Sequence, residues 1–171
     1  GSEMCIRDSD LTYSDKPHTT FLKAVPEAEE ISLIFTAATK TFNIAGCHTG
    51  TTIIPNPKLR LIYDREHAAF GKTPNRFGMI MTEAAYSGGQ EWLDQLMHYL
   101  EKNKRLFTNA MKSLNNVKVF DLESTYLAWV DFSQLDITEL KLKEMLIKEA
   151  GVAPSFGSGF GKNSGKFARF N

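Results

Sequence analysis

The chain has 171 residues, 42% hydrophobic and 11% aromatic, which is enough to bury a core and is not typical of a disordered protein. Lys plus Arg and Asp plus Glu are both 20, so a net charge of zero gives no electrostatic basis for binding nucleic acid or an anionic membrane. Its apolar runs, such as residues 31–35, are far shorter than the roughly 20 residues that cross a bilayer. Two cysteines without metal-ligand spacing fit a reducing compartment. We therefore expect a cytoplasmic α/β protein with no metal site and no membrane or nucleic-acid partner.

The first part of the chain predicts two strands and a helix. Residues 1–8 follow no helical or strand period. A β-branched apolar run at residues 31–35 predicts a buried strand, and residues 49–54 predict a second strand. The Pro-Asn-Pro turn at residues 55–57 ends that strand. Its asparagine can cap a helix that has the second proline at its first position and runs toward Ala69.

Two helices and two strands are expected next. Helical spacing over residues 77–85 and an apolar stripe over residues 92–114 predict two helices, with a Gly-Gly pair between them. Residues 117–120 and 126–132 predict two strands, which we expect to be antiparallel because a short link joins them.

The C-terminal part is expected to contain one more helix and a last strand. Asp136 with Glu139 predicts a capping box for a helix that ends at Gly151. The glycine-rich residues 157–165 then lead into a strand that includes Arg169. We expect two domains, residues 1–72 and residues 73–171.

Lys40 directly follows the first predicted strand and lies among small hydroxyl-bearing residues. A lysine that loses solvation at such a position becomes a nucleophile for carbonyl groups. The hydroxyl groups of Thr36, Thr39 and Thr41 are suited to hydrogen-bond phosphate oxygens nearby. By residue type alone, an ordinary solvated lysine in a loop is the simpler interpretation.

Arg169 lies between aromatic residues in the last predicted strand. Its guanidinium group is suited to bind a carboxylate through two parallel hydrogen bonds. The alternative is an arginine that faces water from an edge strand.

The glycines of residues 157–161 match a phosphate-binding loop only weakly, because the Lys-Ser/Thr pair of that motif is missing. A flexible connection or a loop that gates a substrate site is the simpler interpretation.

Several collinear stretches between Ser9 and Asn171 resemble one family. The segment T-A-A-T-K-T-F-N-I-A-G at residues 36–46 resembles T-A-P-S-K-T-F-N-I-A-G, the segment around the cofactor lysine of cystathionine β-lyases and C–S lyases. These are fold-type-I pyridoxal 5'-phosphate (PLP) enzymes of the class I/II aminotransferase superfamily. Further matches are S-D-L-T-Y, I-I-P-N-P, A-A-Y, E-W-L, S-T-Y-L-A-W and F-A-R-F-N, at residues 9–13, 53–57, 84–86, 91–93, 124–129 and 167–171.

This resemblance implies the C-terminal part of the large PLP-binding domain followed by an α+β small domain. It implies that Lys40 forms a Schiff base with PLP and moves the proton at the substrate α-carbon, and that Arg169 binds the α-carboxylate. The activity implied is carbon–sulfur β-elimination on cystathionine or cysteine-like amino acids, in a homodimeric full-length enzyme of amino acid metabolism. A PLP-dependent aminotransferase and a non-catalytic PLP-fold remnant are the alternatives.

The resemblance also implies roles for four other residues. Thr36 and Thr39 fall where the family contacts the cofactor phosphate. His48 falls eight residues after the lysine, where many members of the superfamily carry an arginine for that phosphate. Tyr126 falls in the substrate pocket.

The N-terminal residues depart from the family pattern. Cys5 stands where the family has the aspartate that pairs with the pyridine nitrogen, and Asp8 stands where it has histidine. We interpret residues 3–8 as foreign or misread sequence at a truncation point. The resemblance covers roughly the C-terminal half of such an enzyme, so we expect this chain alone to be inactive.

Overall fold

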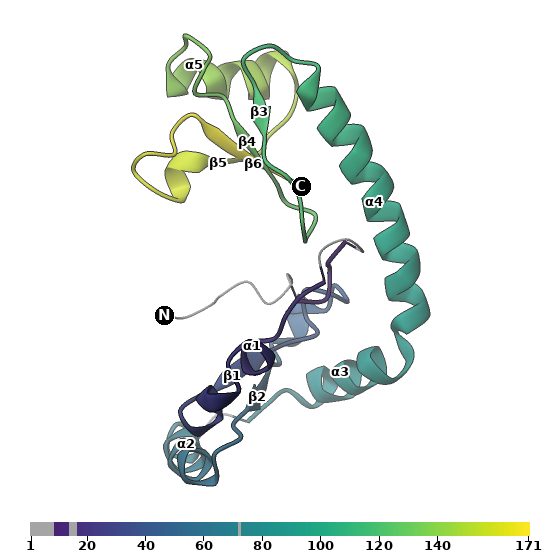
Figure 1. Ribbon diagram of the computed structural model, residues 1–171, viewed down its shortest axis with the longest axis vertical. Coiled ribbons are helices and arrows are strands. Elements are labelled where there is room, and N and C mark those ends of the chain that lie inside the picture. Colours follow the sequence, from purple (N-terminus) through teal and green to yellow (C-terminus); the bar gives the residue numbers. More distant parts are fainter. Residues whose placement is uncertain (1–8, 14–16, 72) are drawn as a thin grey trace. The chain divides into compact units, whose positions relative to one another are not determined.

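The computed structural model describes residues 9–13, 17–71 and 73–171, so Cys5, Asp8 and the rest of residues 3–8 lie outside the described residues. The chain divides into two compact units, one that ends at Met97 and one that begins at His98. This division falls within the long helix α4 (Gln90–Lys112), further along the chain than the expected boundary between residues 72 and 73 (Figure 1). The assignment of residues 1–72 and 73–171 to a large and a small domain stays a prediction.

The first unit combines a two-stranded sheet with helices. In chain order its elements are α1 (Phe21–Ala24), η2 (Pro26–Glu30), β1 (Ile34–Thr36), η3 (Ala45–Cys47), β2 (Thr51–Ile53), α2 (Pro57–Ala69) and α3 (Arg76–Gly88). Strands β1 and β2 pair antiparallel, with Ile34 opposite Ile53. Both predicted strands are therefore present. Strand β1 begins three residues later than the predicted run and ends one residue beyond it, and β2 lies within the predicted residues 49–54.

The start of α2 confirms the interpretation of the Pro-Asn-Pro turn. The side chain of Asn56 accepts hydrogen bonds from the backbone N–H groups of Lys58 (2.8 Å) and Leu59 (3.3 Å). Pro57 is the first helical residue, where a missing N–H group costs nothing.

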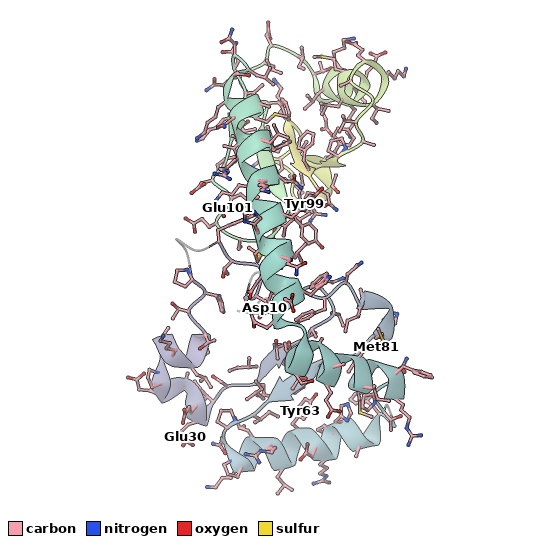
Figure 2. All side chains as sticks on the ribbon, turned by 90° about the vertical axis from the view of Figure 1, so that its right-hand side faces the viewer. Asp10, Glu30, Tyr63, Met81, Tyr99 and Glu101 are labelled. Carbon is pink, nitrogen blue, oxygen red and sulfur yellow. The ribbon has the colours of Figure 1, made fainter. Side chains whose placement is uncertain are left out.

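The expectation that residues 31–35 form a buried strand is wrong. Ile31 is 79% exposed and Phe35 is 58% exposed. Tyr63 of α2 points toward the strands, lies 6.3 Å from the Phe35 ring and has its hydroxyl 3.2 Å from Thr52 Oγ1 (Figure 2). Within the described residues, β1 pairs with β2 alone, and these contacts leave much of the apolar surface of the run in contact with water.

The second unit contains a four-stranded antiparallel sheet with the strand order β3-β4-β6-β5. Its elements, after the second part of α4, are β3 (Lys118–Val119), β4 (Ala128–Asp131), α5 (Glu139–Glu144), η4 (Met145–Glu149), β5 (Ser155–Phe156), η5 (Gly157–Gly159) and β6 (Phe167–Phe170). Lys118 lies opposite Asp131, which confirms the predicted antiparallel pair. Sequence analysis missed β5, because two residues beside a glycine-rich stretch carry no strand period.

One face of this sheet carries the core. Strands alternate their side chains between two faces, so the buried residues of β4 and β6 lie on the same side. The core residues are Ala128, Val130, Phe132, Leu142, Ala168 and Phe170, with Phe107 and Met111 of α4 packed against them. Arg169, between two core residues of β6, belongs to the opposite face.

The last helix begins at a different cap from the predicted one. The side chain of Thr138, not that of Asp136, accepts the hydrogen bond of the Lys141 N–H group (3.2 Å). Gly151 follows the helical residues with φ +67°, which confirms the predicted glycine end.

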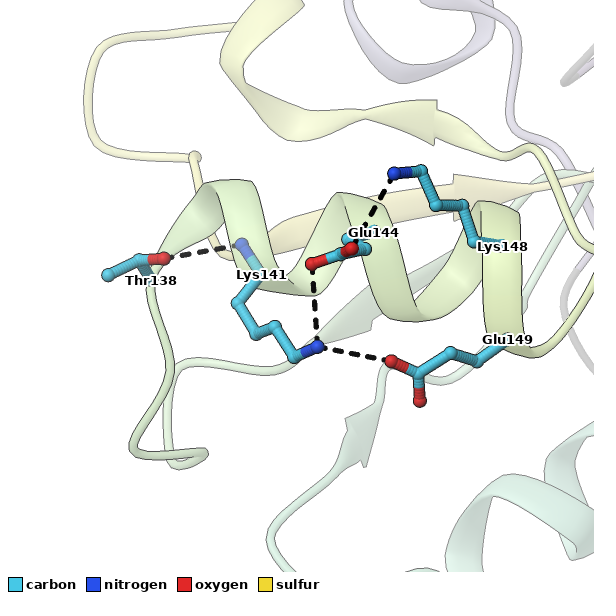
Figure 3. Close-up of polar contacts among 5 residues, drawn as sticks. All are labelled: Thr138, Lys141, Glu144, Lys148 and Glu149. Carbon is cyan, nitrogen blue, oxygen red and sulfur yellow. Dashed lines mark hydrogen bonds and ion pairs between the residues drawn. The ribbon is translucent and has the colours of Figure 1, made fainter.

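Exposed ion pairs run along α5 and η4. Lys141 Nζ lies 3.4 Å from a carboxylate oxygen of Glu144 and 3.1 Å from one of Glu149, and Lys148 reaches Glu144 at 3.5 Å (Figure 3).

None of the helices in the described ranges is both long and apolar enough to span a bilayer.

Candidate functional site

Lys40 lies in a turn that follows β1, and two main-chain hydrogen bonds span it. The Phe42 N–H group donates to the Ala38 carbonyl (3.0 Å), and the Ile44 N–H group donates to the Thr39 carbonyl (2.9 Å). The Lys40 side chain is exposed, so the expected loss of solvation is not found in the described part of the chain. No hydrogen bond or ion pair joins Lys40 to another described residue. The backbone is therefore held on both sides of an amine that is available to a ligand.

Thr41 anchors this turn to an earlier segment. It is 1% exposed, and its Oγ1 donates a hydrogen bond of 2.6 Å to Asp10 Oδ2. A hydroxyl that donates to a carboxylate forms a charge-assisted bond, which is stronger than a neutral one. The Thr41 hydroxyl is therefore used inside the protein, although sequence analysis grouped it with the candidate phosphate ligands.

Tyr86 of α3 belongs to the same group of side chains. Burial raises the pKa of Tyr86, the negative charge of Asp10 raises it further, and a hydrogen bond with the Thr36 side chain lowers it. Asp10, Thr36, Thr41 and Tyr86 thus form one polar cluster, which we call the Asp10 cluster. Sequence analysis gave Asp10 and Tyr86 no role, although both lie in stretches that carry the family resemblance.

The aromatic ring of Phe42 packs the turn against α3 and α4. It lies 6.1 Å from the Tyr86 ring, edge to face, and 5.7 Å from the Trp92 ring. A Cβ atom on Gly89 would lie 2.5 Å from Phe42 Cε1 and 2.4 Å from the Ala85 carbonyl oxygen. Gly89, which separates α3 from α4, therefore also makes room for this ring.

The remaining predicted cofactor residues of the first unit are Thr39 and His48. Thr39 is half-buried beside Lys40. His48 is exposed and has a left-handed backbone (φ +46°) at the end of η3. No side-chain bond of His48 to another described residue is found, so nothing fixes its ring toward Lys40. Their phosphate contacts stay predictions.

Arg169 lies on β6, an inner strand of the sheet in the second unit. Its neighbours in register are Trp129 on β4 and Ser155 on β5. Because β6 is paired on both sides, the alternative of an arginine on an edge strand is wrong.

The Arg169 guanidinium group is partly satisfied by its neighbours. Its Cζ lies 4.7 Å from the centroid of the Phe160 ring, and Nη2 is 3.5 Å from Ser155 Oγ. The Nε atom is buried and has no hydrogen-bond partner among the described residues. An unmade hydrogen bond of this kind costs about 1–3 kcal/mol, so a buried donor without a partner calls for an explanation. A guanidinium group is suited to bind a ligand carboxylate through two parallel hydrogen bonds.

Tyr126 lies in the same unit as Arg169, two residues before β4. It is half-buried and follows Thr125, which has φ +64°, an uncommon conformation for a β-branched residue. The Thr125 hydroxyl accepts a 2.7 Å hydrogen bond from the Leu127 N–H group and so stabilises this bend. The predicted residues thus fall into two sets. Lys40, Thr36, Thr39 and His48 lie in the first unit, and Arg169 and Tyr126 lie in the second.

Comparison with known proteins finds similar proteins that are named as cystathionine β-lyases, C–S lyases or PLP-containing enzymes. The chain is 33% identical over 165 residues to the cystathionine β-lyase PatB of Bacillus subtilis. The alignment covers 95% of this chain and 43% of PatB. The structure matches cystalysin from Treponema denticola, which contains PLP, with a TM-score of 0.87 and 29% identity over 96% of this chain and 42% of that one. It matches a PLP-bound C–S lyase from Staphylococcus hominis with a TM-score of 0.82 and 31% identity over 96% and 40% of the two chains.

Aminotransferases are also among the matched structures, and those below 25% identity support the fold alone. No protein-family model matches the chain. The fold is that of part of a PLP-dependent lyase or aminotransferase, and the chain spans less than half of the length of these relatives.

Proposed function

Because the chain is homologous to cystathionine β-lyases and PLP-dependent C–S lyases, we propose that it supplies Lys40 and Arg169 to the active site of a PLP-dependent carbon–sulfur β-lyase. The substrates are cystathionine and related sulfur-containing amino acids. The products are a thiol, ammonia and pyruvate. This activity belongs to the full-length protein, of which these residues form a part.

The observation that carries the proposal is the free amine of Lys40 on a fixed turn. The two main-chain bonds and the Asp10 cluster hold the backbone, while the exposed amine has no described partner. Lys40 Nζ is thus suited to attach PLP and to take the α-proton of the substrate. PLP, when bound, supplies an electron sink for the negative charge that develops on the α-carbon.

Other residues of the chain are proposed to bind and orient. Arg169 binds the α-carboxylate, which is supported by a guanidinium group whose hydrogen bond to a described residue is a single long one, to Ser155 Oγ (3.5 Å). Thr36, Thr39 and His48 contact the cofactor phosphate, and Tyr126 lines the substrate pocket. In the structure the Thr36 hydroxyl also contacts Tyr86, so we expect Thr36 to share its hydrogen bonds between the phosphate and the Asp10 cluster.

Labelling of Lys40 tests this proposal. We expect borohydride reduction of the full-length protein with PLP to fix the cofactor on the peptide that contains Lys40. Lys40→Ala should abolish the labelling. Lys58→Ala, which removes an exposed lysine at the start of α2, should leave it unchanged. Label on another lysine would contradict the proposal.

An aminotransferase is the second candidate, supported by a similar structure, a PLP-bound putative aminotransferase from Clostridium difficile with 31% identity. The two activities share Lys40 and Arg169 and differ in their need for a second substrate. A lyase releases thiol and keto acid from cystathionine without an added keto acid, whereas an aminotransferase requires a keto-acid acceptor to turn over.

We also propose that the full-length protein is a cytoplasmic homodimer. The free thiol of Cys47 fits a reducing compartment. Large exposed apolar side chains such as Leu61, Phe70 and Phe77, each more than 70% exposed, are suited to further burial in an assembly. Light scattering of the full-length protein gives its mass and tests the dimer.

A further inference from the structure

The ring that covers the Arg169 guanidinium group comes from the glycine-rich stretch, residues 157–165. Phe160 lies in this stretch, directly after η5. Its ring centroid is 4.7 Å from Arg169 Cζ, and the side chain is 52% exposed. Phe160 therefore has the guanidinium group on one side and solvent on the other.

The position of Phe160 is fixed by specific contacts. The edge of its ring meets the Trp129 ring at 5.4 Å with an interplanar angle of 87°. The Phe160 N–H group donates to the Gly157 carbonyl (2.8 Å). Gly157 itself is buried, and a Cβ atom there would lie 1.9 Å from the Ser164 carbonyl oxygen. The stretch thus folds back on itself tightly at Gly157 and holds the ring over Arg169.

A guanidinium group stacked on an aromatic face keeps its N–H groups in its own plane, free for a ligand. The neighbouring Trp129 stacks on Phe167 (5.7 Å, 17°), so the wall beside Arg169 is aromatic on this face of the sheet. Among the described residues, the Arg169 side chain makes one long hydrogen bond, from Nη2 to Ser155 Oγ (3.5 Å), which leaves donors of the group for a ligand. A side chain already held in one conformation loses less entropy when it binds its ligand.

We propose that Phe160 is a positioning residue for the arginine that binds the substrate carboxylate. Its ring holds the Arg169 guanidinium group in one orientation, so that the donors of this group are placed to meet the α-carboxylate. This inference rests on the proposed function and assigns a role in substrate binding to the glycine-rich stretch.

The test compares two ligands in calorimetric titrations of the full-length protein loaded with PLP. L-Alanine carries the α-carboxylate, and ethylamine lacks it. We expect Phe160→Leu, which keeps an apolar side chain but removes the ring, to raise the Kd for L-alanine roughly two- to fivefold and to leave that for ethylamine unchanged. In turnover with cystathionine, KM should rise in the same proportion at constant kcat.

Two further variants serve as controls. Phe160→Tyr keeps the aromatic face and should keep the affinity for L-alanine. Phe21→Leu makes the same change at a side chain of similar exposure, 54%, and should change neither Kd.

The outcomes separate the inference from the proposed function. If Phe160→Leu leaves L-alanine binding unchanged, or weakens both ligands equally, the inference is wrong. In that case a loss of L-alanine binding in Arg169→Lys still supports the role of Arg169. If Arg169→Lys binds L-alanine as the unchanged protein does, the carboxylate site itself is misassigned and both proposals fail.

Discussion

The hydroxyl group of Thr41 connects the lysine turn to a segment 31 residues earlier. It is fully buried, and its partner Asp10 is a carboxylate, so the pair loses a charge-assisted bond if the hydroxyl is removed. We expect Thr41→Val to lower the free energy of unfolding by about 1.5–3 kcal/mol, measured by urea denaturation. Thr39→Val, at a half-buried residue whose hydroxyl has no described bond to another residue, should cost clearly less. Equal losses in both variants would mean that the Asp10 contact adds no stability.

The raised pKa of Tyr86 makes the stability of the Asp10 cluster depend on pH in alkaline solution. Because burial and the Asp10 charge raise the pKa of Tyr86, the folded protein holds this proton more tightly than the unfolded chain does. The associated stability is fully present below the ordinary tyrosine pKa of about 10 and is lost as the pH rises through the higher folded value.

We therefore expect Asp10→Asn to lower the pKa of Tyr86 toward its ordinary value and to reduce this alkaline loss of stability. The phenolate absorbance of each protein, compared with that of its Tyr86→Phe counterpart, isolates the titration of this residue. An unchanged Tyr86 titration in Asp10→Asn would show that the Asp10 charge has no effect on the phenol.

At the scale of elements, Gly88 and Gly89 at the junction of α3 and α4 differ in their surroundings. Gly89 lies against the Phe42 ring, whereas no atom lies within 4 Å of a Cβ added to Gly88. We expect Gly89→Ala to destabilise the protein by about 1–3 kcal/mol, because the new methyl group overlaps the ring and a carbonyl oxygen. Gly88→Ala should be neutral or stabilising by up to about 1 kcal/mol. Thermal unfolding of the two variants gives the comparison, and similar destabilisation by both would contradict it.

The cap of α5 offers a second matched pair. Thr138→Ala removes the acceptor of the Lys141 N–H group and should cost about 0.5–2 kcal/mol. Asp136→Ala changes the residue that the sequence pattern favoured and should cost less than about 0.5 kcal/mol, as is usual for exposed surface positions. Urea denaturation measures the free energy of unfolding of both variants. A larger loss for Asp136→Ala than for Thr138→Ala would mean that Asp136 is the cap, as the sequence pattern predicts.

Sequence analysis correctly predicted the elements whose sequence patterns lie within a few neighbouring residues or one helix. The cap and proline at the start of α2, the stripe of α4 and the glycine end at Gly151 depend on neighbouring residues only. The cap at Thr138 was missed because Asp136 and Thr138 both suit a cap, and the choice depends on how the preceding turn packs.

At the scale of the whole chain, the candidate site was predictable only in part. Lys40 and Arg169 became candidates through collinear motifs, since one lysine or one arginine has no distinctive pattern of its own. The Asp10–Thr41 bond and the Phe160–Arg169 contact join residues distant in sequence, or separated by an irregular stretch, and periodicity does not report such pairs. The inner position of β6 also depends on the pairing of β5, a strand too short to predict.

The strand order β3-β4-β6-β5 has a consequence for how the second unit is made. Strand β6 is one of the two inner strands of this sheet, and among the described strands it is the last to leave the ribosome. Neither β4 nor β5 has its inner neighbour before then, so the sheet cannot close during synthesis of the earlier residues. Such late, non-local pairing slows folding. Arg169, which we propose binds the substrate carboxylate, lies on this same strand, so completion of the sheet and placement of Arg169 are one event.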